Sequence, residues 1–547
     1  MQQSAAEPRG FMGWIDRNFN QLAREMRVSF LPPLMVYAAY GISALTGIVG
    51  TFVVKDYLGL SAAFLSGLGF WIGLPWALKM PIGHFVDLFW RHKAGLIYLG
   101  AFVVAISLLI MVGILISPDA MRQYMSLEKW FVLSTILSPI GYVLQDAVAD
   151  AMTVEAVPKF DESGQPIDAK LQRSMHTTMQ TLGRVALIGG GVIVSLVNIV
   201  LLEGVQNLPK AQQSAVYAKI YTLALIIPVV SILGVWLAGH LRRREGARLR
   251  AQGLDTAEIS RRLDVQSKRP PVNWWVLGGG IAFAFISIIV GLSDFQFGQE
   301  LIFAASMGIV LFLMWRLMRE LSPDARATLL GTAIVIFVFR AMPNVGPGSS
   351  WWSIDVLKFD QEFFAKLSLI GSTLGLIGLF IFRRFMAEKS IFYLVGFLTL
   401  IGTILSLPTL GMFHGMHLWT SAHTGGMVDA RFIAVIDHAL ESPLGQVAMV
   451  PMLAWIANSA PNHLKATFFA VMASFSNLAL SLSSLGTKYL NQIYTVTREV
   501  KDHATGAITT PANYTELGAL LMAVILLSLI LPFIAIAIAR IFRWRSA

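Results

Sequence analysis

The chain has 547 residues, of which 55% are hydrophobic and only 14% are charged, and its formal net charge is +10. Soluble proteins have about 45–50% apolar and about 25% charged residues. The composition therefore excludes a soluble enzyme, a nucleic-acid-binding domain or a disordered scaffold as the main body of the protein. Because the sequence has no cysteine, it also excludes disulfides, thiol catalysis and cysteine-ligated metals.

The apolar residues are gathered in segments of about 20, the length that a helix needs to cross about 30 Å of hydrocarbon. Backbone polar groups must be satisfied within the segment there, which favours helices. We therefore predict fourteen transmembrane helices, with a polar stretch at 241–272 after the sixth. The predicted spans are 33–54, 61–83, 95–117, 130–153, 177–203, 217–240, 273–293, 298–315, 327–345, 363–382, 389–411, 432–457, 466–490 and 515–539.

An even number of spans places both termini on one side of the membrane. With the loops assigned alternately, 28 Lys and Arg residues fall on the side of the termini and 8 on the other. Cytoplasmic loops carry the excess of Lys and Arg. We therefore expect both termini in the cytoplasm and the protein in the cell inner membrane, and the net positive charge requires no nucleic-acid partner.

Two halves of the sequence resemble each other. The segment LGLSAAFLSGLGFWIGLPWALK begins at residue 58, and LKFDQEFFAKLSLIGSTLGLIG begins at residue 357. Asp146 and Asp150 lie in the fourth span of the first half, and Asp437 and Glu441 lie at the same spacing in the corresponding span of the second. Internal duplication is typical of secondary transporters.

The duplication predicts a division of the chain into two six-helix bundles with two additional helices between them. The predicted parts are a cytoplasmic tail at 1–32, a first bundle at 33–240, a basic linker at 241–272, the additional helices and their loop at 273–326, a second bundle at 327–539 and a tail at 540–547.

The acidic residues inside the spans are candidates for proton coupling. An ionised side chain in the middle of a membrane helix costs about 2.5–3.5 kcal/mol on insertion scales. Residues four apart share a helix face, so Asp146 with Asp150, and Asp437 with Glu441, each form a carboxylate patch that can hold and release a proton. An interhelical structural clamp is the alternative role for either pair.

Basic and aromatic residues in the spans are candidates for substrate binding. Arg184 would either neutralise Asp146 or Asp150, or hold a substrate carboxylate in a bidentate pair. We expect Lys79 to attract carboxylates, and Arg340 is assigned to the same set although it lies near the end of its span. Trp76 and Tyr142 are the aromatic candidates for the cavity wall, and packing within the bundle is the alternative for both.

The loop between the second and third spans has the pattern G-x-x-x-D-x-x-x-R, formed by Gly83, Asp87 and Arg91, with Lys93 two residues later. This pattern resembles the loop signature of the major facilitator superfamily, in which the acid and the bases latch the two halves of the transporter. The resemblance implies a gating role for these four residues. It also implies the superfamily's fold, so we predict an all-α membrane protein of fourteen spans, with two pseudo-symmetric bundles and two extra central helices.

Longer motifs resemble the folate–biopterin transporter family. They are LPWALKMPIGHFVD from residue 74, LQDAVADAMTVE from residue 144, the segment from residue 357, DHALESPLGQVAMVPMLAWIANSAP from residue 437 and KATFFAVMASFSNLA from residue 465. Family members are proton-coupled importers of folates, pterins or related conjugates. By this resemblance, the functional residues would be Lys79, Asp87, Asp146, Asp150, Glu155, Asp437 and Glu441, with Glu155 belonging to the gate.

Two other functions are alternatives. The central helix pair also resembles muropeptide permeases, which import cell-wall fragments, and some proteins with this type of fold assist assembly of light-harvesting complexes. No H-E-x-x-H, G-x-S-x-G or P-loop pattern occurs in the sequence, so we do not expect an enzyme. We expect a monomer in the lipid bilayer that handles a small solute and protons by symport, without a metal or cofactor.

Overall fold

The computed structural model describes residues 26–158, 160, 165, 167–263, 272–293, 295–319, 321–447, 465–501 and 508–546. Ten helices among these residues are long and apolar enough to cross a membrane. The described strands are β1 (Val500–Lys501) and β2 (Ile508–Thr510), which form a small antiparallel hairpin. The prediction of a helical protein with many membrane-length segments is therefore confirmed.

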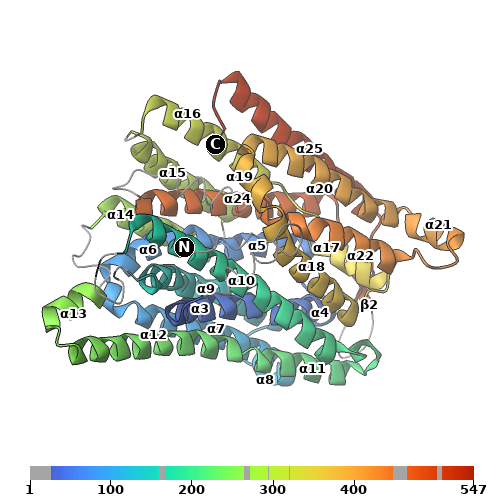
Figure 1. Cartoon of the computed structure of the whole chain (residues 1–547). Helices are drawn as coiled ribbons and strands as arrows, with labels where there is room; N and C mark the ends of the chain where they lie inside the picture. The colour runs from blue at the N-terminus through green and yellow to red at the C-terminus, as the bar shows by residue number, and fades with distance from the viewer. Residues whose placement is uncertain are drawn as a thin grey trace, which may run out of the picture.

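The first half of the chain forms a bundle of long helices (Figure 1). Its elements are η2 (Val28–Phe30), α3 (Leu31–Ile42), η3 (Ser43–Thr46), α4 (Gly47–Tyr57), α5 (Ala62–Ala77), α6 (Lys79–Leu88), η4 (Trp90–His92), α7 (Ala94–Ile116), α8 (Pro118–Arg122), α9 (Leu127–Ala156), α10 (Ala169–Leu202), η5 (Val205–Asn207), α11 (Lys210–Leu223) and α12 (Ile226–Ala251). Helix α12 continues beyond residue 240 into the segment predicted as a linker, where α13 (Thr256–Leu263) follows it.

The second half forms another bundle, and two helices lie between the halves in the sequence. The intervening helices are α14 (Trp274–Leu292) and α15 (Gly298–Met318). The second bundle contains α16 (Pro323–Arg340), α17 (Pro347–Asp355), α18 (Gln361–Ile381), α19 (Arg383–Glu388), α20 (Ile391–Phe413), α21 (Met416–His423), α22 (Ala430–Glu441), η6 (Ser442–Gln446), α24 (Lys465–Ile493) and α25 (Leu517–Ile541). Residues 448–464 lie outside the described residues. The predicted span 432–457 is therefore described only as far as residue 447.

Several helices begin at a polar residue that caps the first turn. The side chains of Ser61, Ser126, Asp360 and Asp429 each accept a hydrogen bond from the backbone N–H three residues later. Such caps satisfy amide groups that have no partner within the helix. The short polar loops between the apolar segments therefore determine where the membrane-length helices start.

Two of the predicted spans are interrupted. The first is divided by the 3₁₀ turn η3 into α3 and α4, and the second is divided at Leu78 into α5 and α6. Pro75 lies inside the last turn of α5, and proline removes a helix hydrogen bond and favours a kink. The interruption at Leu78 makes Lys79 the first residue of a new helix, which matters for the site below.

The two bundles contact each other along two long helix pairs. Helix α5 packs against α24, and α10 packs against α18. Ser474 donates a hydrogen bond to the Ala77 carbonyl over 2.8 Å, and Asn477 donates to the Trp76 carbonyl over 3.0 Å. On the other pair, the hydroxyls of Ser195 and Ser368 lie 2.8 Å apart. Small polar residues thus allow the two halves to approach closely along both pairs.

Helix α15 packs against α24, and α14 packs against α15 and α6 (Figure 1). Gln299 of α15 donates a hydrogen bond to the Gly67 carbonyl of α5 over 3.0 Å. Glu300 of α15 lies 2.9 Å from the Lys488 ammonium of α24. The additional pair is therefore held by polar contacts to both bundles.

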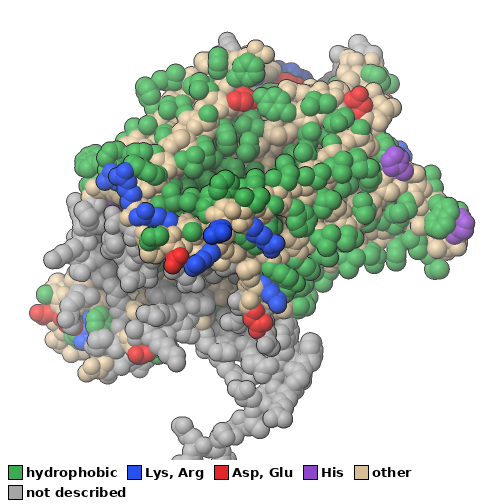
Figure 2. Space-filling model, turned by 90° about the horizontal axis from the view of Figure 1, so that it is seen from above, with side chains coloured by type: hydrophobic (Ala, Val, Ile, Leu, Met, Phe, Trp, Pro, Cys, Tyr) green, Lys and Arg blue, Asp and Glu red, His purple; other side chains and the backbone are tan. Residues whose placement is uncertain are grey.

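The outside of the molecule is apolar over large areas. Figure 2 shows hydrophobic side chains over most of the visible face, with charged side chains gathered towards its margin. Exposed residues such as Phe102, Trp236, Phe285, Ile288 and Leu526 belong to membrane-length helices. A surface of this kind is expected where a lipid bilayer, rather than water, surrounds the helices.

Candidate functional site

A charged cluster in the first bundle is centred on Lys79. The Lys79 ammonium lies 2.5 Å from a carboxylate oxygen of Asp146 and 2.7 Å from one of Asp150. Both acids belong to α9, one helical turn apart, as their spacing predicts. The side chain of Asp146 is 16% exposed and that of Asp150 is 43% exposed, so Asp146 is the more enclosed member of the pair.

The break between α5 and α6 explains why Lys79 needs two acids. Lys79 is the first residue of α6, and a helix N-terminus carries a partial positive charge that disfavours a cation. Helix α6 packs against α9, which brings Asp146 and Asp150 to this end of α6. The two carboxylates thus offset both the lysine charge and the unfavourable end of the helix dipole.

Tyrosine side chains of α3 complete the cluster. The Tyr37 hydroxyl donates a hydrogen bond of 2.6 Å to Asp150. Tyr40 packs against Trp76 with ring centroids 5.6 Å apart, and against Tyr142 with centroids 5.3 Å apart. The structure thus brings the two predicted aromatic residues together, through a third ring, next to the charged groups.

Arg184 of α10 is a second cation near the cluster. Its charge acts on Asp146 and Tyr37, but among the described residues no ion pair within 4.0 Å joins it to either aspartate. Arg184 is only partly buried. The described side chains therefore show no direct ion pair between Arg184 and the aspartates, which was one of the two roles predicted for Arg184.

The acids of the second bundle have a different environment. Asp437 and Glu441 lie on α22, four residues apart. One carboxylate oxygen of Asp437 is buried without a hydrogen-bond partner, and Glu441 is exposed. No ion pair to either acid is found among the described residues, so the second pair lacks the counter-charge that the first pair has.

The predicted gate residues lie at the end of the first bundle that carries α6. Lys93 forms an ion pair of 2.6 Å with Glu155 and also lies 4.1 Å from the centre of the Trp90 ring. Gly83 is part of α6. The side chains of Asp87 and Arg91 are outside the part of the structure that is described. Arg340, assigned above to substrate binding, is the last residue of α16 and is partly buried.

The opposite end of the molecule, which carries the β1–β2 hairpin, is called here the hairpin end (Figure 1). A network there joins the two bundles. Lys55 of α4 lies 2.6 Å from Asp355 of α17, and Tyr514 donates a hydrogen bond of 2.5 Å to the same carboxylate. Arg498 donates to the carbonyls of Lys55 and Leu60 over 2.7 and 2.6 Å. Burial lowers the pKa of the Arg498 guanidinium, and burial together with Asp355 raises the pKa of the Tyr514 hydroxyl.

Sequence reasoning missed Tyr37, Tyr40 and the hairpin-end network. The two tyrosines are polar aromatic residues three positions apart in an apolar span, which puts both on one helix face. That spacing was a usable signal. The hairpin-end network gave no such signal in the sequence, because Lys55, Asp355 and Arg498 lie near loops and far apart along the chain.

Long apolar helices that surround a cluster of partly buried charges are typical of membrane transporters. The chain belongs to the BT1 family, whose model matches residues 40–543. It is 22% identical over 456 residues to the folate-biopterin transporter of Synechocystis sp., a match that covers 82% of this chain and 72% of that protein. Membership of this transporter family also indicates that the chain is not an enzyme.

Solved structures of transporters have the same fold. The POT family transporter PepTSo superposes with a TM-score of 0.57 at 12% identity, covering 95% of this chain and 98% of that one. An auto-inhibited POT family peptide transporter gives a TM-score of 0.56 at 14% identity, covering 96% of this chain and 98% of that one. At such low identity these matches establish the fold alone.

Proposed function

We propose that the chain is a proton-coupled symporter that imports an anionic solute of folate or pterin type. Two six-helix bundles of the major facilitator type would rock around a central site, within fourteen spans, in the inner membrane with both termini in the cytoplasm. The observation that carries this proposal is the contact of Lys79 with both Asp146 and Asp150. The substrate class rests on the name of the Synechocystis relative.

The charge balance of the cluster supports coupling of a proton to an anion. Lys79 and Arg184 contribute two positive charges, and Asp146 and Asp150 contribute two negative charges, so the ionised cluster is neutral. Adding one proton to a carboxylate leaves one positive charge without a partner. Because an uncompensated charge in a site of low polarity is unfavourable, the protonated cluster would bind a solute carboxylate more strongly than the deprotonated cluster.

The basic and aromatic residues have separate roles in this proposal. Arg184 has no ion pair to the aspartates, so its guanidinium would bind a carboxylate in a bidentate pair. Lys79 would join it after an aspartate takes up a proton. Tyr40, Trp76 and Tyr142 would provide ring surfaces beside these charges. Asp437 and Glu441 would form a second protonation site in the other bundle, and Arg340 would contribute to the positive potential there.

The contacts at the two ends suggest how access would alternate. The hairpin-end network holds the bundles together on one side. At the other end, Gly83, Asp87, Arg91, Lys93 and Glu155 would latch the bundles when the hairpin end opens. The ion pair between Lys93 and Glu155 lies within the first bundle and would hold the segment after α6 in position for this latch.

The test is uptake of labelled folate into proteoliposomes with an imposed proton gradient. Asp146→Asn should abolish uphill accumulation but retain exchange of folate across the membrane, since the neutral side chain keeps the size of the carboxyl group and cannot release a proton. Asp119→Asn, at an exposed position of the short helix α8, is the matched control and should transport like the unmodified protein. Undiminished accumulation by Asp146→Asn would remove this acid from the mechanism, and uptake of a muropeptide but not of folate would overturn the substrate class.

A further inference from the structure

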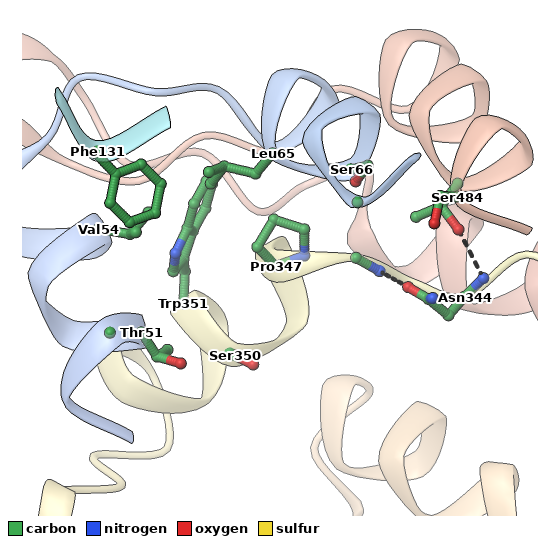
Figure 3. A pocket seen from close by; sticks show the side chains of 14 residues that line it. Thr51, Val54, Leu65, Ser66, Phe131, Asn344, Pro347, Ser350, Trp351 and Ser484 are labelled. Atoms are coloured by element: carbon green, nitrogen blue, oxygen red, sulfur yellow. Dashed lines mark hydrogen bonds between the residues drawn. The ribbon is translucent and has the colours of Figure 1, made fainter. Parts of the chain in front are cut away.

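A cavity of about 490 Å³ lies between the two bundles near the hairpin end (Figure 3). The first bundle contributes Thr51 of α4 and Ser66 of α5, and the second contributes Asn344, Ser350 and Trp351 near α17 and Ser484 of α24. Cavities that bind small organic molecules have volumes of about 300–1,000 Å³. Its size and its position between the moving halves are those of a solute site.

The cavity wall combines polar and apolar groups but carries no charge. None of its fourteen lining residues has an ionisable side chain, which distinguishes it from the Lys79 cluster. A charged group placed there would lose its hydration without gaining a counter-charge, which is strongly unfavourable. The cavity therefore selects an uncharged group.

The hydroxyl groups of the wall are arranged as hydrogen-bond acceptors. The hydroxyls of Thr51, Ser66 and Ser484 donate to the backbone carbonyls four residues earlier, over 3.2, 2.8 and 3.2 Å. Each hydroxyl has one proton and two lone pairs, so the lone pairs remain for a ligand. A ligand group that binds these three hydroxyls must bring its own N–H or O–H donors.

An indole ring forms one side of the cavity. Trp351 is 1% exposed, and the Arg498 guanidinium lies 4.6 Å from its ring centre. Figure 3 shows the ring beside Thr51 and Val54, with Phe131 behind them. Trp351 is therefore held in place by its neighbours, and it fixes the shape of this side of the cavity.

The cavity and the charged cluster stand on the same helix. Gly69 of α5 lines the cavity, and Trp76, seven residues later, contacts the aromatic group beside Lys79. Seven residues correspond to about 10 Å along a helix. An elongated solute with a ring at one end and a carboxylate at the other spans such a distance.

We propose that this cavity binds an uncharged ring with N–H donors, while the anionic end of the same solute lies at the Lys79 and Arg184 cluster. The inference rests on the proposed function, because it divides the solute of that function between two subsites. It assigns ring recognition to Thr51, Ser66 and Ser484, which the sequence did not single out. It also explains how a neutral cavity and a charged cluster serve one substrate.

The experiment measures binding of two part-molecules to the purified full-length protein. Biopterin has the ring without a carboxylate, and p-aminobenzoylglutamate has the carboxylates without the pterin ring. Thr51→Val keeps the shape of the side chain but removes its lone pairs. We expect it to weaken biopterin binding by roughly three- to tenfold, the loss of one hydrogen bond, and to leave p-aminobenzoylglutamate binding unchanged. Arg184→Gln should have the opposite pattern.

The matched control is Thr403→Val. Thr403 makes the same hydrogen bond to the carbonyl four residues earlier, over 2.7 Å, but does not line the cavity. It should bind both probes like the unmodified protein, and thermal unfolding identifies any variant that has lost its fold. If Thr51→Val and Ser350→Ala both bind biopterin normally, the cavity is not the ring subsite and the inference is wrong. If the unmodified protein binds neither probe nor folate, the proposed substrate class is itself wrong.

Discussion

The two acid pairs have the same spacing in the two halves of the chain but different surroundings. Asp146 and Asp150 contact Lys79, and Tyr37 donates a hydrogen bond to Asp150. Asp437 has a buried carboxylate oxygen without a partner, and no cation pairs with it or Glu441 among the described residues. The matching positions of the acids in the sequence therefore do not give them matching electrostatic environments in the structure.

This difference separates two ways of keeping a carboxylate inside a helix bundle. A fixed cation lies beside the first pair, whereas the described residues place no cation beside the second. Removal of a cation should therefore destabilise the first pair, and neutralising an acid of the second pair should break no ion pair among these residues. The three substitutions below test this contrast.

The largest effect is expected for Lys79→Gln. The substitution leaves two carboxylates facing each other without their cation, and breaking a buried ion pair from one side costs about 3–5 kcal/mol. We expect a large fall in the unfolding temperature measured in detergent, together with loss of folate uptake. Lys79→Arg, which keeps the charge, should recover most of the stability. A Lys79→Gln protein as stable as the unmodified one would show that the ion pairs do not hold the cluster together.

A smaller effect is expected for Tyr37→Phe. This change removes only the hydroxyl that donates to Asp150, and a hydrogen bond to a charged group contributes about 1.5–3 kcal/mol. Stability should fall by less than with Lys79→Gln, and uptake should decrease several-fold rather than disappear. Tyr489→Phe is not a suitable control because its hydroxyl contacts Glu300. Tyr98→Phe, at an exposed position of α7, serves instead. An equal loss of stability in both tyrosine variants would argue against a specific role for Tyr37.

The smallest effect on stability is expected for Asp437→Asn. Replacing an acid that has no ion pair among the described residues removes an unfavourable burial and breaks none of the contacts seen there, so the free energy of unfolding should change by about 1 kcal/mol or less, in either direction. Uptake driven by a proton gradient should nevertheless decrease. If Asp437→Asn destabilised the protein as much as Lys79→Gln, the second pair would have a partner and the contrast would be wrong.

The local features of the fold were predictable from the sequence. Long apolar segments predicted membrane-length helices because hydropathy and helix length are properties of neighbouring residues. The four-residue spacing correctly predicted that Asp146 and Asp150 share a face. Even so, the interruption at Leu78, which makes Lys79 the start of a helix, was not predicted, since Pro75 is compatible with either a kink or a break.

The partners of these residues were not predictable in the same way. Lys79 and Asp146 are 67 positions apart, and Asn477 and Trp76 are 401 apart. No periodicity within one segment indicates which helix lies beside another. The cavity near Trp351 was also not predicted, because serine, threonine and asparagine in a membrane helix can pack helices together as well as line a cavity.

The order of polar and apolar segments, and with it the presence of membrane-length helices, follows from residues that are neighbours along the chain, because each helix satisfies its own backbone hydrogen bonds. Which acid lies beside a cation depends instead on the packing of α6 against α9. The uncharged cavity exists only where α4, α5 and α24 meet α17 and the segment before it. Electrostatic energy depends on distances in space. The environments of Asp146 and Asp437 were therefore decided by the tertiary structure and not by their matching positions in the sequence.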